Sequence, residues 1–334
     1  MICYSLSRRN AVALALLAAL TAPMTPALLA QAAQAPQTNV PPAPAAQPAQ
    51  VAGPVFPKPE PTDFTADSPT KEQVDAFLQA SWGYDPNRVY QVSRIMKTAT
   101  PGISNVVVLV GEKGRKETGA LQFFAMPDGK HIIANNEMLP FGPHPYADNR
   151  AKLLELAVGP SQGASSKDLE IVEFADFQCP HCKDAQPTVQ KILTDFPKAH
   201  FVFESFPLPQ HPQAFRAAEY GVCVAKLGGD KAFFDYDIAV YDGQAGLATD
   251  EGATLTLNSA VTKAGQDPAK VEECVKTPEA KATVDASVKL ARELNVNETP
   301  WLFINGRGIP LLGVNYDTIK EMISRHSAND GPAK

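Results

Sequence analysis

Hydrophobic and polar positions divide the chain into two blocks with different periodicities. In the first block, a helix with one apolar face is expected to begin at Ser68 and Pro69, as capping residue and first helical residue. Three short apolar runs separated by glycine-bearing turns then predict strands, at residues 106–111, 120–126 and 130–135. The pattern therefore predicts a small α+β domain of antiparallel strands over residues 69–144, followed by a connecting helix and linker at 145–164.

The second block reads as a β-α-β unit, a helical insertion and a β-β-α unit. A buried strand is expected at 169–177 and runs directly into a helix that carries Cys182 on its inner face. The remaining elements are a strand at 200–206, a helical stretch at 213–294, strands at 301–305 and 308–314, and a last helix. We therefore place an α/β domain at residues 165–326, with its helical insertion at about 210–294 and a tail at 327–334.

The N-terminal segment has the layout of a secretory signal peptide. Arg8 and Arg9 precede the apolar run at residues 11–22, and the small-residue site Ala30-Gln31-Ala32 follows. The run is too short to span a bilayer, which takes about 20 apolar residues. We expect residues 1–32 to be removed by cleavage near Ala32 and the mature protein to be periplasmic. Arg8 and Arg9 leave both the general secretory and the twin-arginine routes open.

Residues 33–68 are rich in proline, alanine and glutamine. Such a segment buries too little apolar surface to offset its ordering entropy, so it is expected to be a disordered linker with extended character. Two interpretations remain open. The segment is either a spacer that holds the folded domains away from a surface or partner, or an exposed tail without a task.

Length, charge and cysteine content exclude several classes. A length of 334 residues with 44% hydrophobic residues suits about two folded domains rather than a disordered chain. The net charge of −6 lacks the basic surface that nucleic-acid binding requires. Five cysteines are present, but Cys3 would leave with the signal peptide. The mature protein would then carry an even set of four cysteines in an oxidising compartment.

Two of these cysteines form the motif Cys179-Pro180-His181-Cys182, where the strand turns into the helix. Backbone N–H groups at a helix start favour an anion, so the pKa of Cys179 should be lowered, and His181 adds a further donor nearby. Proline at the first helical position costs no hydrogen bond. A redox dithiol is favoured over the two alternatives, a zinc site lacking its other ligands and an inert structural disulfide.

The segment EFADFQCPHC closely resembles the active site of the DsbA-like thiol:disulfide oxidoreductases of the bacterial periplasm. The resemblance implies a thioredoxin fold with a helical insertion over residues 165–326, and Cys179-Pro180-His181-Cys182 matches its oxidising members. It also implies that Glu173 is a buried acid that relays protons for Cys182. The alternative is a carboxylate paired locally at the strand end.

Further residues match the same family. Thr299-Pro300 lies where the family has a cis-proline loop that faces the active site and binds an extended substrate peptide. Cys223 and Cys274 lie in the helical insertion, as a cysteine pair does in many relatives, so a structural disulfide is expected and a relay role is the alternative. His211, between prolines, is expected to be a packing residue rather than a residue of the active-site groove.

The first block resembles the N-terminal domain of the DsbC and DsbG isomerases, through Pro101-Gly102-Ile103 and Met126-Pro127-Asp128-Gly129. In that family this domain dimerises. The resemblance therefore implies a homodimer, and a capping domain on a monomer is the alternative.

The favoured function is an exported oxidoreductase that introduces disulfides into reduced secreted proteins and is reoxidised by a quinone-coupled, DsbB-like membrane partner. The same chemistry could run in reverse, in a dimeric isomerase or reductase kept reduced by a membrane reductant. A non-enzymatic metal-binding or holdase module is the third hypothesis. We expect no cofactor, no metal and no nucleic-acid partner.

Overall fold

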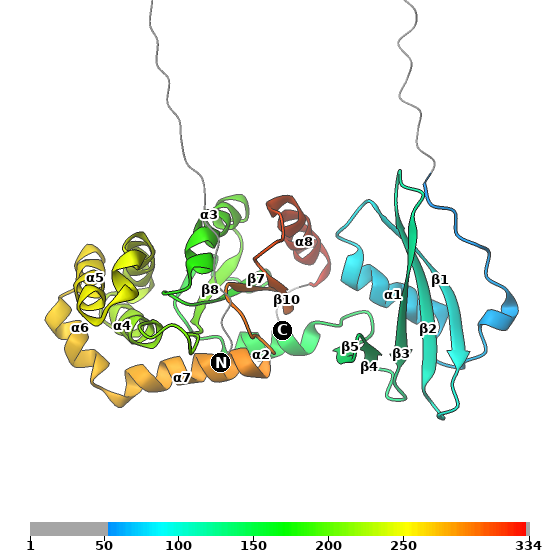
Figure 1. Cartoon of the computed structure of the whole chain (residues 1–334), viewed down its shortest axis with the longest axis horizontal. Coiled ribbons are helices and arrows are strands. Elements are labelled where there is room, and N and C mark those ends of the chain that lie inside the picture. Colours follow the sequence, from blue (N-terminus) through cyan, green and yellow to red (C-terminus); the bar gives the residue numbers. More distant parts are fainter. Residues whose placement is uncertain (1–52, 332–334) are drawn as a thin grey trace, which may run out of the picture. The chain divides into compact units, whose positions relative to one another are not determined.

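Two β-sheets organise the part of the chain that the computed structural model describes, residues 53–331 (Figure 1). The first sheet is built from residues 88–140 and the second from residues 161–310. The predicted signal peptide with its cleavage site near Ala32, the linker up to residue 52 and residues 332–334 of the tail lie outside the described residues. Within the described residues, no helix is long and apolar enough to cross a bilayer.

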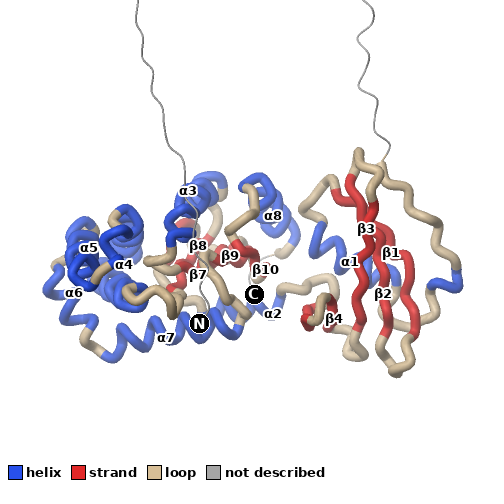
Figure 2. The backbone as a smooth tube through the Cα atoms, in the orientation of Figure 1, coloured by secondary structure: helices blue, strands red, loops and turns tan. Residues whose placement is uncertain are grey.

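The first sheet is an antiparallel meander whose strands are paired in chain order. They are β1 (Arg88–Lys97), β2 (Ser104–Glu112), β3 (Thr118–Ala125), β4 (His131–Ala134) and β5 (Glu137–Pro140), shown in red in Figure 2. Helix α1 (Lys71–Trp82) buries Val74, Phe77 and Leu78 in one apolar core with this sheet. The expected α+β domain of antiparallel strands is therefore present.

Strand β1 was not predicted from the sequence, although it is the longest strand of the sheet. Its register against β2 shifts between Val92 and Arg94, which is the mark of a β-bulge. Val92 and Ile95 both point into the core, so the apolar positions are three apart instead of two or four. The bulge thus hides the alternation by which a strand is recognised.

The folded region begins earlier than the predicted boundary at residue 69. The backbone N–H groups of Thr65 and Ala66 donate to the carbonyl oxygen of Ile95 at 3.0 and 3.1 Å, and Phe64 packs against the core of the first sheet. Gln91 donates from Nε2 to the carbonyl oxygen of Pro57 at 2.6 Å. The end of the predicted linker is therefore fixed to the sheet, because backbone and aromatic contacts offset its low apolar content.

The predicted start of α1 is also corrected. Thr70, rather than Ser68, is the N-cap, and Pro69 precedes the helix instead of opening it. The Thr70 hydroxyl accepts from the Gln73 backbone N–H at 3.3 Å, and the Gln73 side chain accepts from the Thr70 N–H at 2.8 Å. This reciprocal capping box satisfies two N–H groups at once, which a cap at Ser68 would not do.

The second sheet has the strand order β10-β9-β7-β8-β6. Its strands are β6 (Ser161–Gly163), β7 (Glu170–Ala175), β8 (His200–Ser205), β9 (Trp301–Ile304) and β10 (Arg307–Pro310). The central strand β7 is parallel to β8 and antiparallel to β9, and all six of its residues are buried. Strand β6 is a short polar addition at the edge that the sequence did not predict.

Helices cover both faces of the second sheet. Helices α3 (Pro180–Asp195) and α8 (Tyr316–Asn329) share one apolar core with Ile171 and Phe203 of the sheet. On the opposite face, α2 (Ala147–Leu156) and α7 (Pro278–Glu293) pack in a second core that contains Val172. The sheet is buried on both sides, as expected for a central parallel strand pair.

The helical insertion follows β8 and consists of α4 (Ala214–Asp242), a short 3₁₀ turn (Gln244–Ala248), α5 (Asp250–Lys263), α6 (Pro268–Val275) and α7, drawn in yellow and orange in Figure 1. Gly229 interrupts α4 with φ 76°, a left-handed conformation that glycine adopts without strain. The second half of α4 thus takes a new direction, and its residues after Gly229 line the core beside β7 and β8.

Candidate active site

The central feature of the candidate site is the turn between β7 and α3. Cys179 is the N-cap of α3, Pro180 occupies the first helical position and Cys182 lies in the first turn. Both cysteines are free thiols, with Cys179 3% exposed and Cys182 fully buried. Pro180 and His181 are exposed beside them. The buried strand β7 therefore delivers the cysteine pair to the end of the sheet, with only its Pro-His edge open to solvent.

Several donors stabilise the thiolate of Cys179. Its pKa falls to about 5, first because the Cys182 thiol donates a hydrogen bond to its sulfur. Burial opposes this change, while the Thr299 side chain and the backbone N–H groups of Cys182 and His181 add to it. The helix start and His181 were expected from the sequence to lower the pKa of Cys179. The hydrogen bond from the Cys182 thiol, which lowers this pKa most, was not expected. Cys179 is thus ionised at neutral pH, as a reactive thiol must be.

Cys182 has the opposite character. Burial raises the pKa of its thiol well above the usual value, and the neighbouring Cys179 adds to this rise. The backbone N–H of Asp176 points at the Cys182 sulfur from 3.4 Å. Because the Cys182 thiol donates a hydrogen bond to the Cys179 sulfur, Cys179 ionises readily and Cys182 keeps its proton.

The loop before β9 approaches the same sulfur. The Thr299–Pro300 peptide bond is cis, and the Thr299 carbonyl oxygen lies 3.6 Å from Cys179 Sγ. Thr299 is 3% exposed. The structure thus brings Thr299 and Pro300 against Cys179, although 120 residues separate them in the chain.

The buried Asp176 and the half-buried His211 form a polar pair beside the active-site turn, which was not expected from the sequence. Asp176 Oδ2 lies 2.7 Å from His211 Nδ1 and accepts from the Leu208 backbone N–H at 2.8 Å. Asp176 Oδ1 accepts from the Gln178 backbone N–H at 2.7 Å. His211 was expected to be a packing residue, but its ring contacts the carboxylate that holds the turn. The feature of the sequence that could have indicated this contact is the position of His211 in the Pro-rich segment after β8.

A further polar side chain ties the helical insertion to the turn. Gln244 Nε2 donates to the carbonyl oxygens of Phe177 and Cys179, both at 2.9 Å. The Tyr241 hydroxyl donates to the Asp176 carbonyl oxygen at 3.4 Å. The insertion therefore fixes the backbone on both sides of Cys179, and no local pattern in the sequence marks this contact.

Glu173 lies in the middle of β7 and is 1% exposed. Burial raises the pKa of its carboxyl to about 8. Its Oε1 atom has no hydrogen-bond partner among residues 53–331, which disfavours the alternative of a fully paired carboxylate at the strand end. The structure places Glu173 on the sheet face that the helical insertion covers, together with Phe203 of β8.

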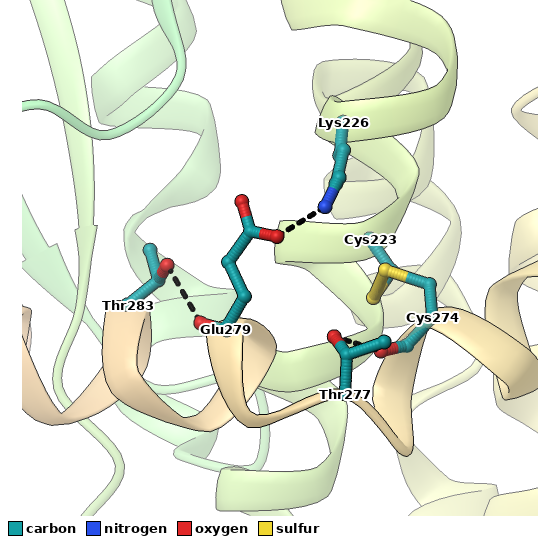
Figure 3. Close-up of a disulfide and its surroundings, with 6 residues drawn as sticks. All are labelled: Cys223, Lys226, Cys274, Thr277, Glu279 and Thr283. Carbon is teal, nitrogen blue, oxygen red and sulfur yellow. Dashed lines mark hydrogen bonds and ion pairs between the residues drawn. A yellow bond between two sulfur atoms is a disulfide. The ribbon is translucent and has the colours of Figure 1, made fainter.

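Cys223 and Cys274 form a disulfide that joins α4 to α6 (Figure 3). Their Cα atoms are 5.8 Å apart, and the bridge links residues separated by 51 positions. An ion pair between Lys226 and Glu279 lies beside it and connects α4 to α7. The bridge and the ion pair hold three helices of the insertion together, and Cys223 is fully buried.

Metal binding finds no support in the arrangement of donor groups. In the described part of the chain, no cluster of three or more His, Cys, Asp and Glu side chains is placed to hold a metal ion.

The fold and the sulfur geometry define a thioredoxin-type redox domain, and comparison with known proteins agrees. The family model described as thioredoxin matches residues 157–325, about half of the chain. The chain therefore belongs to the thioredoxin family, and the predicted fold class is confirmed.

Individual relatives match the same region. The chain is 26% identical to a probable disulfide bond formation protein D from Bacillus cereus, over 49% of this chain and 77% of that protein. It is 31% identical to a Na(+)/H(+) antiporter NhaA 1 from Salinispora arenicola, over 44% of this chain. The chain spans only about a fifth of the length of the curated antiporters that it matches.

Among solved structures, ScsC from Proteus mirabilis in a transitional conformation is 23% identical, with a TM-score of 0.46, over 55% of this chain and 78% of that one. The family match and the disulfide bond formation relatives cover the same region, so the thioredoxin domain expected from the sequence is confirmed, and its similarity to DsbA-like thiol:disulfide oxidoreductases is supported.

Proposed function

We propose that the chain acts as an oxidase that introduces disulfides into reduced, exported proteins. A substrate thiolate attacks Cys179 Sγ in the oxidised pair, the Cys179–Cys182 bond breaks, and its electron pair passes to Cys182, which takes up a proton. A second substrate thiolate then attacks the substrate sulfur of the mixed disulfide. Cys179 leaves as a thiolate, the substrate holds a new disulfide, and the enzyme is reduced.

One observation carries this direction of reaction: the Cys179 thiolate is stabilised by the donors around it, and its pKa lies near 5. A stabilised thiolate is a good leaving group and makes the reduced enzyme the favoured form. The oxidised pair then tends to accept electrons from substrate dithiols. Cys179 itself is 3% exposed, so a substrate is proposed to approach it from the exposed edge at Pro180 and His181.

Thr299 and Pro300 are proposed to bind the substrate. The loop before β9 would pair with an extended peptide through backbone hydrogen bonds, as in strand addition to a sheet edge. The Thr299 carbonyl lies 3.6 Å from Cys179 Sγ, so a peptide aligned there would present its cysteine to the reactive sulfur. Glu173 is proposed to exchange protons with Cys182, because it is buried on the same strand that leads to the turn.

The cellular setting follows from residues 1–32, which have the composition of a cleaved export signal. We propose that the mature chain works in the periplasm and that a membrane protein coupled to quinone reoxidises it. N-terminal sequencing of the exported protein tests the first step and should begin just after Ala32. A mature chain that retains Arg8 and Arg9 contradicts it.

The direction of electron flow is tested by the reduction potential of the mature protein, which begins after Ala32 and lacks Cys3. Equilibration with glutathione should give a value nearer to about −120 mV, typical of a strong oxidant, than to about −270 mV, typical of a reductase. The variant Cys223→Ser/Cys274→Ser serves as control, since it leaves only the Cys179–Cys182 pair to titrate. Thiol trapping in cells should find that pair mostly oxidised.

An isomerase is the second candidate, and the first sheet supports it. Its edge strand β5 exposes the apolar side chains of Met138 and Leu139, which are 61% and 37% exposed. An open edge with apolar side chains favours pairing with a second copy. Analytical ultracentrifugation that finds a dimer, together with a pair trapped mostly in its reduced form, selects the isomerase over the oxidase.

A further inference from the structure

A second buried acid lies near Glu173, and none of the chemistry above uses it. Asp237, in the second half of α4, is 5% exposed, and its Oδ1 atom has no hydrogen-bond partner among the described residues. Burying an unpaired carboxylate is costly, so the group is expected to be protonated unless a partner compensates. Burial raises the pKa of its carboxyl well above the usual value, and the charge of Glu173 adds to this rise.

The strand register places the two acids on facing surfaces. Glu173 of β7 is paired with Phe203 of β8, and residues paired in this way project from the same face of the sheet. The Phe203 ring contacts Phe233 of α4, with ring centroids 5.0 Å apart. Asp237 is one helical turn beyond Phe233 and shares its side of the helix. Asp237 therefore faces the part of the sheet that carries Glu173.

The same helix surface continues to the active-site turn. Tyr241, one turn beyond Asp237, donates from its hydroxyl to the Asp176 carbonyl oxygen at 3.4 Å. The Asp176 backbone N–H in turn points at Cys182 Sγ, also at 3.4 Å. Burial raises the pKa of the Tyr241 hydroxyl, and the charges of Cys182, Asp237 and Glu173 add to this rise. One face of α4 thus spans the distance from Glu173 to the buried sulfur.

At its outer side, Asp237 reaches solvent. It lines a cleft of about 370 Å³ whose walls are mainly polar side chains from β6, α3 and α4. These are Ser161, Gln162, Gln190, Lys231 and Asp235. Glu173 does not line this cleft. A proton that enters from solvent through this cleft therefore reaches Asp237 before it reaches Glu173.

We propose that Asp237 is the outer member of a proton relay that connects the cleft between α3, α4 and β6 with Glu173 and, through it, with Cys182. When a substrate thiolate opens the Cys179–Cys182 bond, Cys182 leaves as a thiolate and takes a proton from Glu173. Asp237 then returns a proton to Glu173 and regains one from solvent in the cleft. When the pair is reoxidised, Cys182 gives up its proton and the transfers run backwards.

This inference rests on the proposed exchange of protons between Glu173 and Cys182. Two carboxyl groups buried near one another do not both ionise at neutral pH, so the pair holds a proton ready for transfer. The groups that face Asp237 are Glu173 from β7, Tyr236 and Tyr241 on its own helix, and Lys231 and Asp235 at the cleft. Asp237 is thus a positioning residue that acts through Glu173, and it does not touch the reacting sulfur atoms.

The test is the rate at which dithiothreitol reduces the oxidised full-length protein, followed by stopped flow from pH 5 to pH 9. We expect Asp237→Asn to slow this reduction about tenfold at neutral pH, to flatten its pH profile and to increase its solvent deuterium isotope effect. Asp237→Glu should restore the rate to within about threefold of the original. Asp235→Asn is the matched control, since Asp235 lines the same cleft but is partly exposed and pairs with Lys231.

The outcomes separate this proposal from the function on which it rests. If Glu173→Gln is slow while Asp237→Asn matches the unchanged protein in rate and pH profile, the relay through Asp237 is wrong and the role of Glu173 stands. If both variants react like the unchanged protein, the role of Glu173 fails as well. If Asp237→Asn does not fold, the infrared difference spectrum of the unchanged protein decides. A protonated-carboxyl band assigned to aspartate by isotope labelling must shift between the oxidised and reduced forms, and its absence overturns the proposal.

Discussion

The two cysteine pairs lie in the same domain, and three of the four sulfur-bearing residues are buried while Cys274 is partly buried, yet their surroundings give the pairs opposite chemistry. Cys179 and Cys182 are three positions apart at one helix start, where hydrogen bonds lower the pKa of the first thiol and burial raises the pKa of the second. Cys223 and Cys274 are 51 residues apart and form a closed bridge between helices. Burial alone therefore does not make a thiol inert, and the donors directed at its sulfur decide whether it reacts.

Removing one sulfur from each pair should separate the two roles most strongly. Cys179→Ser is expected to abolish oxidation of a dithiol peptide, with a loss of at least about 10³-fold, because the attacked sulfur is gone. Cys223→Ser/Cys274→Ser should keep the activity within about threefold at a temperature where the protein is folded. The rate of peptide oxidation measures both, and a comparable loss in the second variant contradicts the division of roles.

The free energy of unfolding should depend more on the Cys223–Cys274 pair than on the Cys179–Cys182 pair. Cys223→Ser/Cys274→Ser frees a loop of 51 residues in the unfolded chain and should lower the free energy of unfolding by about 4 kcal/mol. Urea denaturation followed by circular dichroism gives this value. Cys179→Ser is the control and should change the stability of the reduced protein much less at pH 5, where ionisation of Cys179 contributes little. A loss below about 1 kcal/mol in the double variant would show that the bridge does not brace the insertion.

Glu173 links the site to the pH dependence of stability. Its pKa is about 8 in the folded protein and near 4.5 in the unfolded chain, so folding favours the protonated form. The contribution of Glu173 to the free energy of unfolding is complete below pH 4.5. It decreases by about 1.4 kcal/mol per pH unit between pH 4.5 and about pH 8 and is constant at higher pH. Glu173→Gln should remove this slope and gain stability relative to the unchanged protein by a few kcal/mol at alkaline pH. Unfolding curves at pH 5, 7 and 9 test the sign, and an unchanged slope contradicts it.

The two thiols of the reactive pair should differ in alkylation. With a pKa of about 5, Cys179 is almost fully thiolate at pH 7, so it should react with iodoacetamide at least about 10²-fold faster than Cys182. Its rate should fall as the pH drops through 5. Because its folded pKa lies below the unfolded one, its contribution to the stability of the reduced protein is full above the unfolded pKa and is lost as the pH falls through 5. Mass spectrometry of the alkylated peptides measures the ratio, and equal rates contradict the assignment.

The smallest effect is expected from His211→Asn. The variant loses the contact of the ring with Asp176 Oδ2, but the Leu208 N–H remains as a donor to the same atom. We expect a loss of about 1–2 kcal/mol in stability and a change of less than tenfold in the oxidation rate. His200→Asn offers a control, since His200 bonds the Ala164 carbonyl away from the turn. If both variants behave alike, the Asp176–His211 pair has no particular part in holding the turn.

The sequence was informative wherever a short stretch of chain decides the structure. The apolar run at residues 169–177 predicted the buried strand β7, and Cys179-Pro180 predicted the start of α3. Predictions from the sequence were wrong where contacts with neighbouring strands change the local pattern of apolar residues. The bulge near Val92 concealed β1, and contacts to Ile95 fixed a segment that composition alone assigned to the linker.

The reactive motif, the helix that begins at Pro180 and the order of the elements from β7 to α8 were determined by the sequence alone, because each depends on residues a few positions apart. The approach of Thr299 to Cys179, the contact between Asp176 and His211, and the position of Asp237 opposite Glu173 were decided only by the tertiary structure. These groups come from distant parts of the chain. What brings them together is the pairing of strands and the packing of α4 on the sheet, which no local pattern of residues encodes.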